Sequence, residues 1–111
     1  MLCVARQTIG RRAVLALDGE LDIATVTMLA DLVQQVVDDG AAELWIDLTG
    51  TTFMDSSGVH LLVDTHHQLG ALNRRLAVIC DHGPVRRLFE ATGAEALLSV
   101  YDSRSAANGA G

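Results

Sequence analysis

Positive charge and cysteine are both scarce in this sequence of 111 residues, and each shortage argues against a class of protein. The eight cations are all arginine and the net charge is -6, whereas proteins that bind nucleic acids or anionic membranes need a basic surface. Two cysteines, Cys3 and Cys80, are too few for a disulfide framework. No apolar run approaches the ~18 residues of a membrane span, and no secretory signal opens the sequence. We therefore expect a cytoplasmic protein that contacts neither nucleic acid nor a membrane directly.

The sequence also lacks the motifs of common catalytic and nucleotide-binding sites. It has no glycine-rich phosphate loop and no GxSxG signature. Ser56 and His60 are spaced as a nucleophile and base one helical turn apart, but no oxyanion hole or substrate cleft accompanies them. We therefore predict a protein that is not an enzyme and has no cofactor.

What the sequence does have is a regular series of apolar patterns over the length of about one domain. Leu2–Ile9 and Ala13–Leu17 are predicted strands around a short turn, which favours an antiparallel hairpin. Apolar residues at spacings of three and four predict helices at 24–39 and 56–69, each followed by a glycine. Short apolar runs predict strands at 44–48, 76–80 and 97–101, and Pro84 opens a short helix that ends at Gly93.

These elements follow one another in the order β-β-α-β-α-β-α-β. Strands that alternate with helices form right-handed crossovers, so the predicted fold class is α/β, with a mixed, mostly parallel sheet and an N-terminal hairpin. The domain is predicted to cover residues 1–102. The tail, residues 103–111, has no apolar period and is predicted to be flexible.

The segment Phe53–Gly58 lies between a predicted strand and helix, at the sheet edge where α/β proteins usually bind ligands and partners. Asp55 is a preferred N-cap residue type, and Ser56 then takes the first helical position. Asp22 belongs to a similar acidic segment after an earlier strand, so both aspartates are expected to flank Ser56. The alternative is that each aspartate only begins its own helix.

Three motifs, GELD at 19–22, FMDSSG at 53–58 and GPVRRLFEATG at 83–93, resemble the STAS domain of bacterial anti-sigma factor antagonists. The likeness covers residues 1–102, and the small α/β fold of that family agrees with the predicted order of elements. Members bind anti-sigma factors that are also serine kinases, and their phosphorylated serine follows the aspartate of the middle motif. The resemblance implies phosphorylation at Ser56 and a partner of that kind.

It also implies that the surface around Ser56 contacts the partner. The residues expected there are Asp22, Ile23, Asp55, Ser56, Ser57, Gly58 and Val59. A phosphate adds about -1.5 to -2 charges, and beside two aspartates it would repel a docked partner, whereas a helix N-terminus tolerates it. The expected protein is an antagonist that binds an anti-sigma factor when unphosphorylated, releases a sigma factor, and is switched off at Ser56.

Two other functions stay open. A STAS subunit of another assembly, such as a lipid-transport complex, uses similar motifs without phosphorylation. A redox-controlled antagonist would depend on a disulfide between Cys3 and Cys80.

The chain departs from the family's pattern in two places. His60 and Asp64 stand where the family usually has small or apolar residues, so we expect them to adjust partner specificity. With His67 they have a spacing that metal sites use, but a solvated polar face is the favoured interpretation and no metal is predicted. Residues 105–111 are too poor in large apolar side chains to form the amphipathic helix that usually ends the domain, which favours weak self-association.

Overall fold

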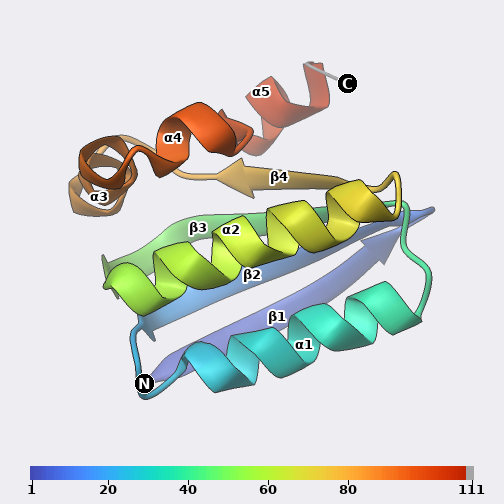
Figure 1. Cartoon of the computed structure of the whole chain (residues 1–111), viewed down its shortest axis with the longest axis horizontal. Helices are drawn as coiled ribbons and strands as arrows, with labels where there is room; N and C mark the ends of the chain where they lie inside the picture. The colour runs from blue at the N-terminus through green and yellow to red at the C-terminus, as the bar shows by residue number, and fades with distance from the viewer. Residues whose placement is uncertain (110–111) are drawn as a thin grey trace.

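A five-stranded sheet with helices on both faces forms the framework of the computed structural model, which describes residues 1–109 (Figure 1). Strands β1 (Leu2–Ile9) and β2 (Arg12–Leu21) pair antiparallel as a hairpin. The next three strands, β3 (Glu43–Met54), β4 (Arg75–Ile79) and β5 (Val100–Tyr101), continue the sheet in parallel and in chain order. The predicted fold class is therefore confirmed.

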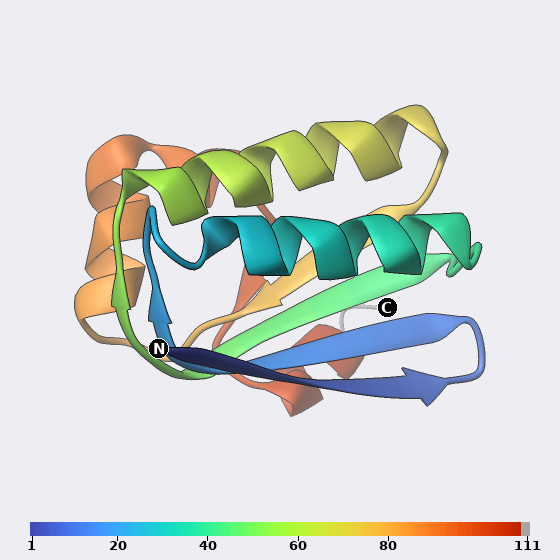
Figure 2. The same ribbon diagram turned by 90° about the horizontal axis from the view of Figure 1, so that it is seen from below.

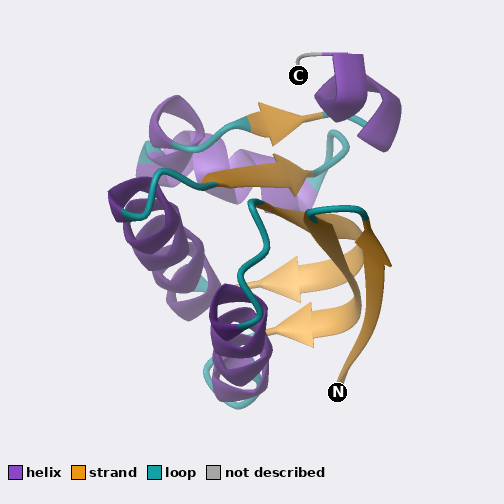
Figure 3. Ribbon diagram, turned by 90° about the vertical axis from the view of Figure 1, so that its right-hand side faces the viewer, coloured by secondary structure: helices purple, strands orange, loops and turns teal. Residues whose placement is uncertain are grey.

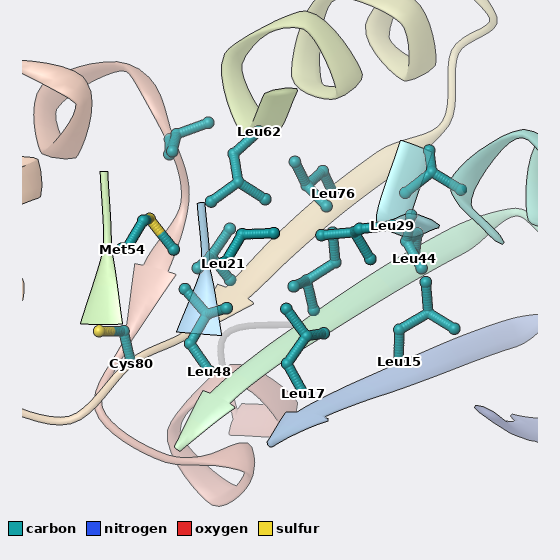
Figure 4. Close-up of a cluster of buried hydrophobic side chains, with 14 of the residues drawn as sticks. Leu15, Leu17, Leu21, Leu29, Leu44, Leu48, Met54, Leu62, Leu76 and Cys80 are labelled. Carbon is teal, nitrogen blue, oxygen red and sulfur yellow. The ribbon is translucent and has the colours of Figure 1, made fainter. Parts of the chain in front are cut away.

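Two long helices, α1 (Val26–Asp38) and α2 (Ser56–Ala71), lie side by side over one face of the sheet (Figure 2). Each buries an apolar stripe, made of Leu29, Val33 and Val36 in α1 and of Val59, Leu62 and Leu69 in α2. Leucines of β2, β3 and β4 pack beneath them (Figure 4). Successive side chains of a strand point to opposite faces of the sheet, so every second residue of these strands faces α1 and α2. The larger cluster of buried residues lies on this face.

Two shorter helices, α3 (Pro84–Thr92) and α4 (Ala94–Leu97), cross the end of the sheet. Arg86, whose side chain is only 11% exposed, joins them to the strands. Its guanidinium donates to the Cys80 carbonyl, Glu95 and Asp102 at 2.9, 2.7 and 2.8 Å. Gly93 has a φ of 78°, so it turns the chain directly from α3 into α4. The sequence did not predict α4, and the strand expected at 97–101 begins only at Val100.

The expectation that residues 105–111 are too poor in large apolar side chains to form the helix that ends the domain is wrong. Helix α5 (Arg104–Gly109) packs on the sheet face opposite α1 and α2 (Figure 3). The Ser103 hydroxyl accepts the Ala106 N–H at 3.1 Å and so caps the helix. The side chain that α5 buries is small, Ala107 at 1% exposed, so an apolar pattern of large residues was not needed. Residues 110 and 111 of the predicted tail lie outside the described residues.

Candidate functional site

Helices α1, α2 and α3 all begin at one edge of the sheet, where β2, β3 and β4 end (Figure 1). The β2–α1 connection carries Asp22 and Ile23, and the β3–α2 junction carries Asp55 and Ser56. The segment after β4 leads into α3 at Pro84. Because parallel strands end at the same edge, three motifs far apart in the sequence come together here.

Asp55 organises this edge. It is the N-cap of α2 with extended backbone (φ -108°), and its carboxylate accepts the Ser57 N–H at 3.0 Å and the Ser57 hydroxyl. The other carboxylate oxygen accepts the Ile23 N–H at 3.2 Å. The bond from the Ser57 hydroxyl, aided by backbone N–H groups, outweighs partial desolvation and holds the pKa of Asp55 below its usual value. Asp55 is therefore an anion that ties the β2–α1 loop to α2.

Asp22 is engaged in its own turn. One carboxylate oxygen accepts the N–H groups of Ala24 and Thr25 at 3.0 and 3.1 Å and the Thr25 hydroxyl at 3.2 Å. Asp22 therefore holds the turn that precedes α1, and the helix itself begins at Val26 with Thr25 as its N-cap, so Asp22 does not begin the helix as the alternative supposed. Through Ile23, however, the same loop is bonded to Asp55, so Asp22 still adds negative charge close to the start of α2.

The two serines of the motif have different environments. Ser57 is half-buried, and its hydroxyl donates to Asp55. Ser56 is exposed at the first position of α2 and lines a groove of about 310 Å³. His60 and Asp64 of α2 line the same groove, and the α3–α4 corner forms its other wall with Thr92, Gly93, Ala94 and Leu97. Ser56 is thus the accessible hydroxyl, as the sequence predicts.

Gly58 and Val59 were expected on a partner-contact surface, but both are buried. Val59 is 4% exposed and packs in the core beneath the groove. Gly58 is buried, and a Cβ on it would lie 2.8 Å from Cγ of Met54. Both positions face inward because α2 turns its third and fourth residues toward the sheet.

Two exposed apolar side chains lie on the same edge: Ile23, which was expected on the partner surface, and Phe53, which sequence reasoning missed. Ile23 is 76% exposed and Phe53 is 53% exposed. Phe53 belongs to a second groove of about 360 Å³, which runs between the end of β3 and α3 and includes Pro84, Arg87 and Leu88. Contiguous apolar surface, such as Phe53 forms with Pro84 and Leu88 in this groove, is typical of interaction sites. The alternation of side chains along β3 could have predicted this exposure, because Phe53 must point outward if its neighbour Met54 points into the core.

The structure does not support control by a disulfide. Cys3 is exposed on the edge strand β1, whereas Cys80 is buried just after β4. Two strands separate β1 from β4 in the sheet, so about 14 Å of strand spacing lies between them, against a Cα separation of about 7 Å at most in a disulfide. Burial also raises the pKa of Cys80 to about 11, which leaves its thiol protonated and unreactive at neutral pH.

Within residues 1–109, no group of three His, Cys, Asp or Glu side chains could hold a metal ion. Over the same residues, no helix is both long enough and apolar enough to cross a membrane.

Together these features define a small α/β domain whose accessible edge surrounds one exposed serine at the start of a capped helix. Residues 4–107 match the STAS domain, and the chain belongs to this family. An anti-sigma-B factor antagonist of Staphylococcus aureus is 33% identical over 84 residues, which cover 76% of this chain and 78% of that protein.

Solved structures share the fold over almost the whole chain. An anti-sigma factor antagonist from Mycobacterium paratuberculosis superposes with a TM-score of 0.92 at 25% identity, covering 99% of this chain and 93% of the other. The Bacillus cell fate determinant SpoIIAA, solved in a phosphorylated form, gives a TM-score of 0.73 at 22% identity, covering 98% of this chain and all of the other. The second likeness shows that this fold exists in a phosphorylated protein.

Proposed function

We propose that this protein is an anti-sigma factor antagonist that acts by binding and not by catalysis. In its unphosphorylated form it binds an anti-sigma factor with serine kinase activity, and a sigma factor is thereby released. Phosphorylation of Ser56 ends the binding. The Staphylococcus relative, named as an antagonist at 33% identity, supports the general function, and the accessible Ser56 supports the switch.

The partner surface that we propose is the sheet edge around Ser56. Ile23 and Phe53 offer exposed apolar area, and Asp55 ties the β2–α1 loop, which carries Ile23, to the start of α2. A partner docked here covers Ser56 and removes it from water. The neutral hydroxyl costs little to bury when it is hydrogen-bonded, whereas a buried charge without a partner is strongly unfavourable.

A phosphate on Ser56 adds about -1.5 to -2 charges beside the carboxylates of Asp22 and Asp55. Like-charge repulsion and desolvation then oppose docking. The helix dipole at the start of α2 favours the phosphate, so the domain itself stays folded. Phosphorylation therefore separates the partners without unfolding this protein.

The test is affinity capture from the lysate of the native host with wild type, Ser56→Glu and Ser105→Glu, followed by mass spectrometry. Ser105 is an exposed serine on α5, on the opposite face of the sheet, so Ser105→Glu controls for added charge alone. We expect wild type and Ser105→Glu to capture an anti-sigma factor, and Ser56→Glu to bind it at least ~10-fold more weakly in a titration with the purified partner.

Equal affinity for all three proteins would contradict control at Ser56. Capture of membrane-transport subunits by the wild type, with no anti-sigma factor, would instead indicate a STAS subunit of another assembly.

A further inference from the structure

His60 lies one helical turn after Ser56, and both side chains line the groove between α2 and the α3–α4 corner. Residues four apart on a helix have Cβ atoms about 5–6 Å from each other. Because Cα–Cβ bonds tilt toward the N-terminus of a helix, the imidazole of His60 leans over the turn that holds Ser56. A group attached to the Ser56 hydroxyl is within its reach.

Two titratable side chains, His60 and Asp64, line this groove. On α2 the titratable neighbour of His60 is Asp64, and the α3–α4 wall contributes Thr92, Gly93, Ala94 and Leu97, none of which titrates. Among residues 1–109, His60 is the one side chain lining this groove that can carry a positive charge. Of the two arginines of α3, Arg86 is already bonded to Glu95 and Asp102, and Arg87 lines the other groove, beside Phe53.

The cation closest to a phosphate on Ser56 would therefore be the protonated imidazole of His60, on the same helix. Phosphate oxygens are strong acceptors, and hydrogen bonds between charged groups are shorter and stronger than neutral ones. A histidine changes charge near neutral pH, and the second ionisation of phosphoserine falls in the same range. The two groups can thus stabilise each other's charged form.

We propose that His60 is the counter-ion of phosphorylated Ser56 and holds the phosphate against the mouth of the groove. The inference rests on the proposed phosphorylation and adds its pH dependence. The pair requires a protonated imidazole, so we expect it to weaken when the ring loses its proton. Phosphorylation then changes the shape of this surface as well as its charge.

The test uses the full chain with phosphoserine placed at position 56 during synthesis, so that it requires no kinase and no partner. NMR follows the ring resonances of His60 and His67 against pH, with and without the phosphate. His67 is an exposed histidine of the same helix, about 16 Å from Ser56 and about 10 Å from His60 along the helix axis. We expect the titration midpoint of His60 to rise by roughly 0.5 pH units or more on phosphorylation, and that of His67 to stay in place.

A reciprocal measurement completes the test, because a coupling between two protonation sites acts equally on both. In the phosphorylated protein, His60→Gln should raise the midpoint of the phosphate ³¹P titration toward that of free phosphoserine, and His67→Gln should leave it unchanged. An unchanged midpoint of His60, or of the phosphate in His60→Gln, would overturn the proposal. Neither result depends on anti-sigma factor binding, so this inference and the proposed function can fail separately.

Discussion

Asp47 is a buried residue of β3 whose negative charge is paired with Arg104 of α5. Its side chain is 11% exposed and accepts the Thr49 N–H at 2.9 Å and Nε of Arg104 at 2.7 Å. Burial alone would raise the pKa of Asp47, but the hydrogen bonds from Thr49 and Arg104 outweigh it and lower the pKa. The folded protein therefore binds a proton at Asp47 less readily than the unfolded chain does.

This lowered pKa makes the contribution of Asp47 to stability depend on pH. A group whose pKa is lower in the folded state stabilises above its unfolded pKa, and that stabilisation is lost as the pH falls through the carboxyl range. We expect Asp47→Asn to lower the free energy of unfolding by about 1–2 kcal/mol at pH 7, allowing for the partly exposed Arg104. The difference should shrink between about pH 5 and pH 3. Urea denaturation at several pH values measures it.

The matched control is Asp31→Asn, at an exposed position of α1. It should change stability by less than about 0.5 kcal/mol at any of these pH values. If Asp47→Asn costs as much at pH 3 as at pH 7, the carboxylate charge is not what stabilises this site.

At the scale of single residues, local chemistry was predictable and long-range contacts were not. Asp55 was predicted as an N-cap because its residue type precedes an apolar helical pattern, and the structure confirms it. Its bond to Ile23 spans 32 residues, and no local pattern contains it. Gly58 was misassigned because its small size is required by packing against Met54 and Leu21, which only the fold brings together.

The close approach of α2 to the sheet gives a prediction at the scale of elements. A Cβ at Gly58 would lie 2.8 Å from Met54 Cγ and 3.1 Å from Leu21 Cδ2, and both side chains are buried. We expect Gly58→Ala to push α2 away from β2 and β3 and to lower the free energy of unfolding by about 1–3 kcal/mol. Thermal or urea unfolding measures the change.

Gly70, near the other end of α2, provides the control. A Cβ there would meet nothing within 4 Å. Gly70→Ala should therefore raise stability by about 0.5–1 kcal/mol, since alanine favours the helix more than glycine does. Opposite signs for the two substitutions would establish that contact with the sheet, and not helix propensity, fixes Gly58. A loss at both positions would contradict this.

The bounds of elements were predictable where caps and periodicity agree. Helices α1, α2 and α3 begin and end within two residues of the predicted positions. Strand β3 continues from the predicted 48 to Met54, because its polar second half pairs with Asp18–Leu21 of β2 across two register shifts. This second half of β3 is stabilised by pairing with a distant segment and not by a local apolar pattern. The strand predicted from the apolar run was therefore too short.

The whole molecule covers the two faces of its sheet unequally. One face carries α1 and α2, and the other carries the short helix α5 (Figures 2 and 3). Beneath α5 lies a smaller cluster of buried residues, which consists of Val14, Trp45, Ala77, Ile79 and Ala107. The sequence predicts that the domain ends at residue 102, which would leave this cluster without Ala107 and Asp47 without Arg104.

A chain ending at Asp102 tests the contribution of α5. Its loss would expose Trp45 and Ile79, now 4% and 1% exposed, and we expect a free energy of unfolding lower by about 2–4 kcal/mol. Fluorescence from Trp45, the one tryptophan, should shift to longer wavelength, and light scattering should show association that increases with concentration. A chain ending at Ala107 keeps both contacts and should match the full chain in all three measurements. If the chain ending at Asp102 also matches it, α5 adds nothing to the folded domain and residues 1–102 suffice.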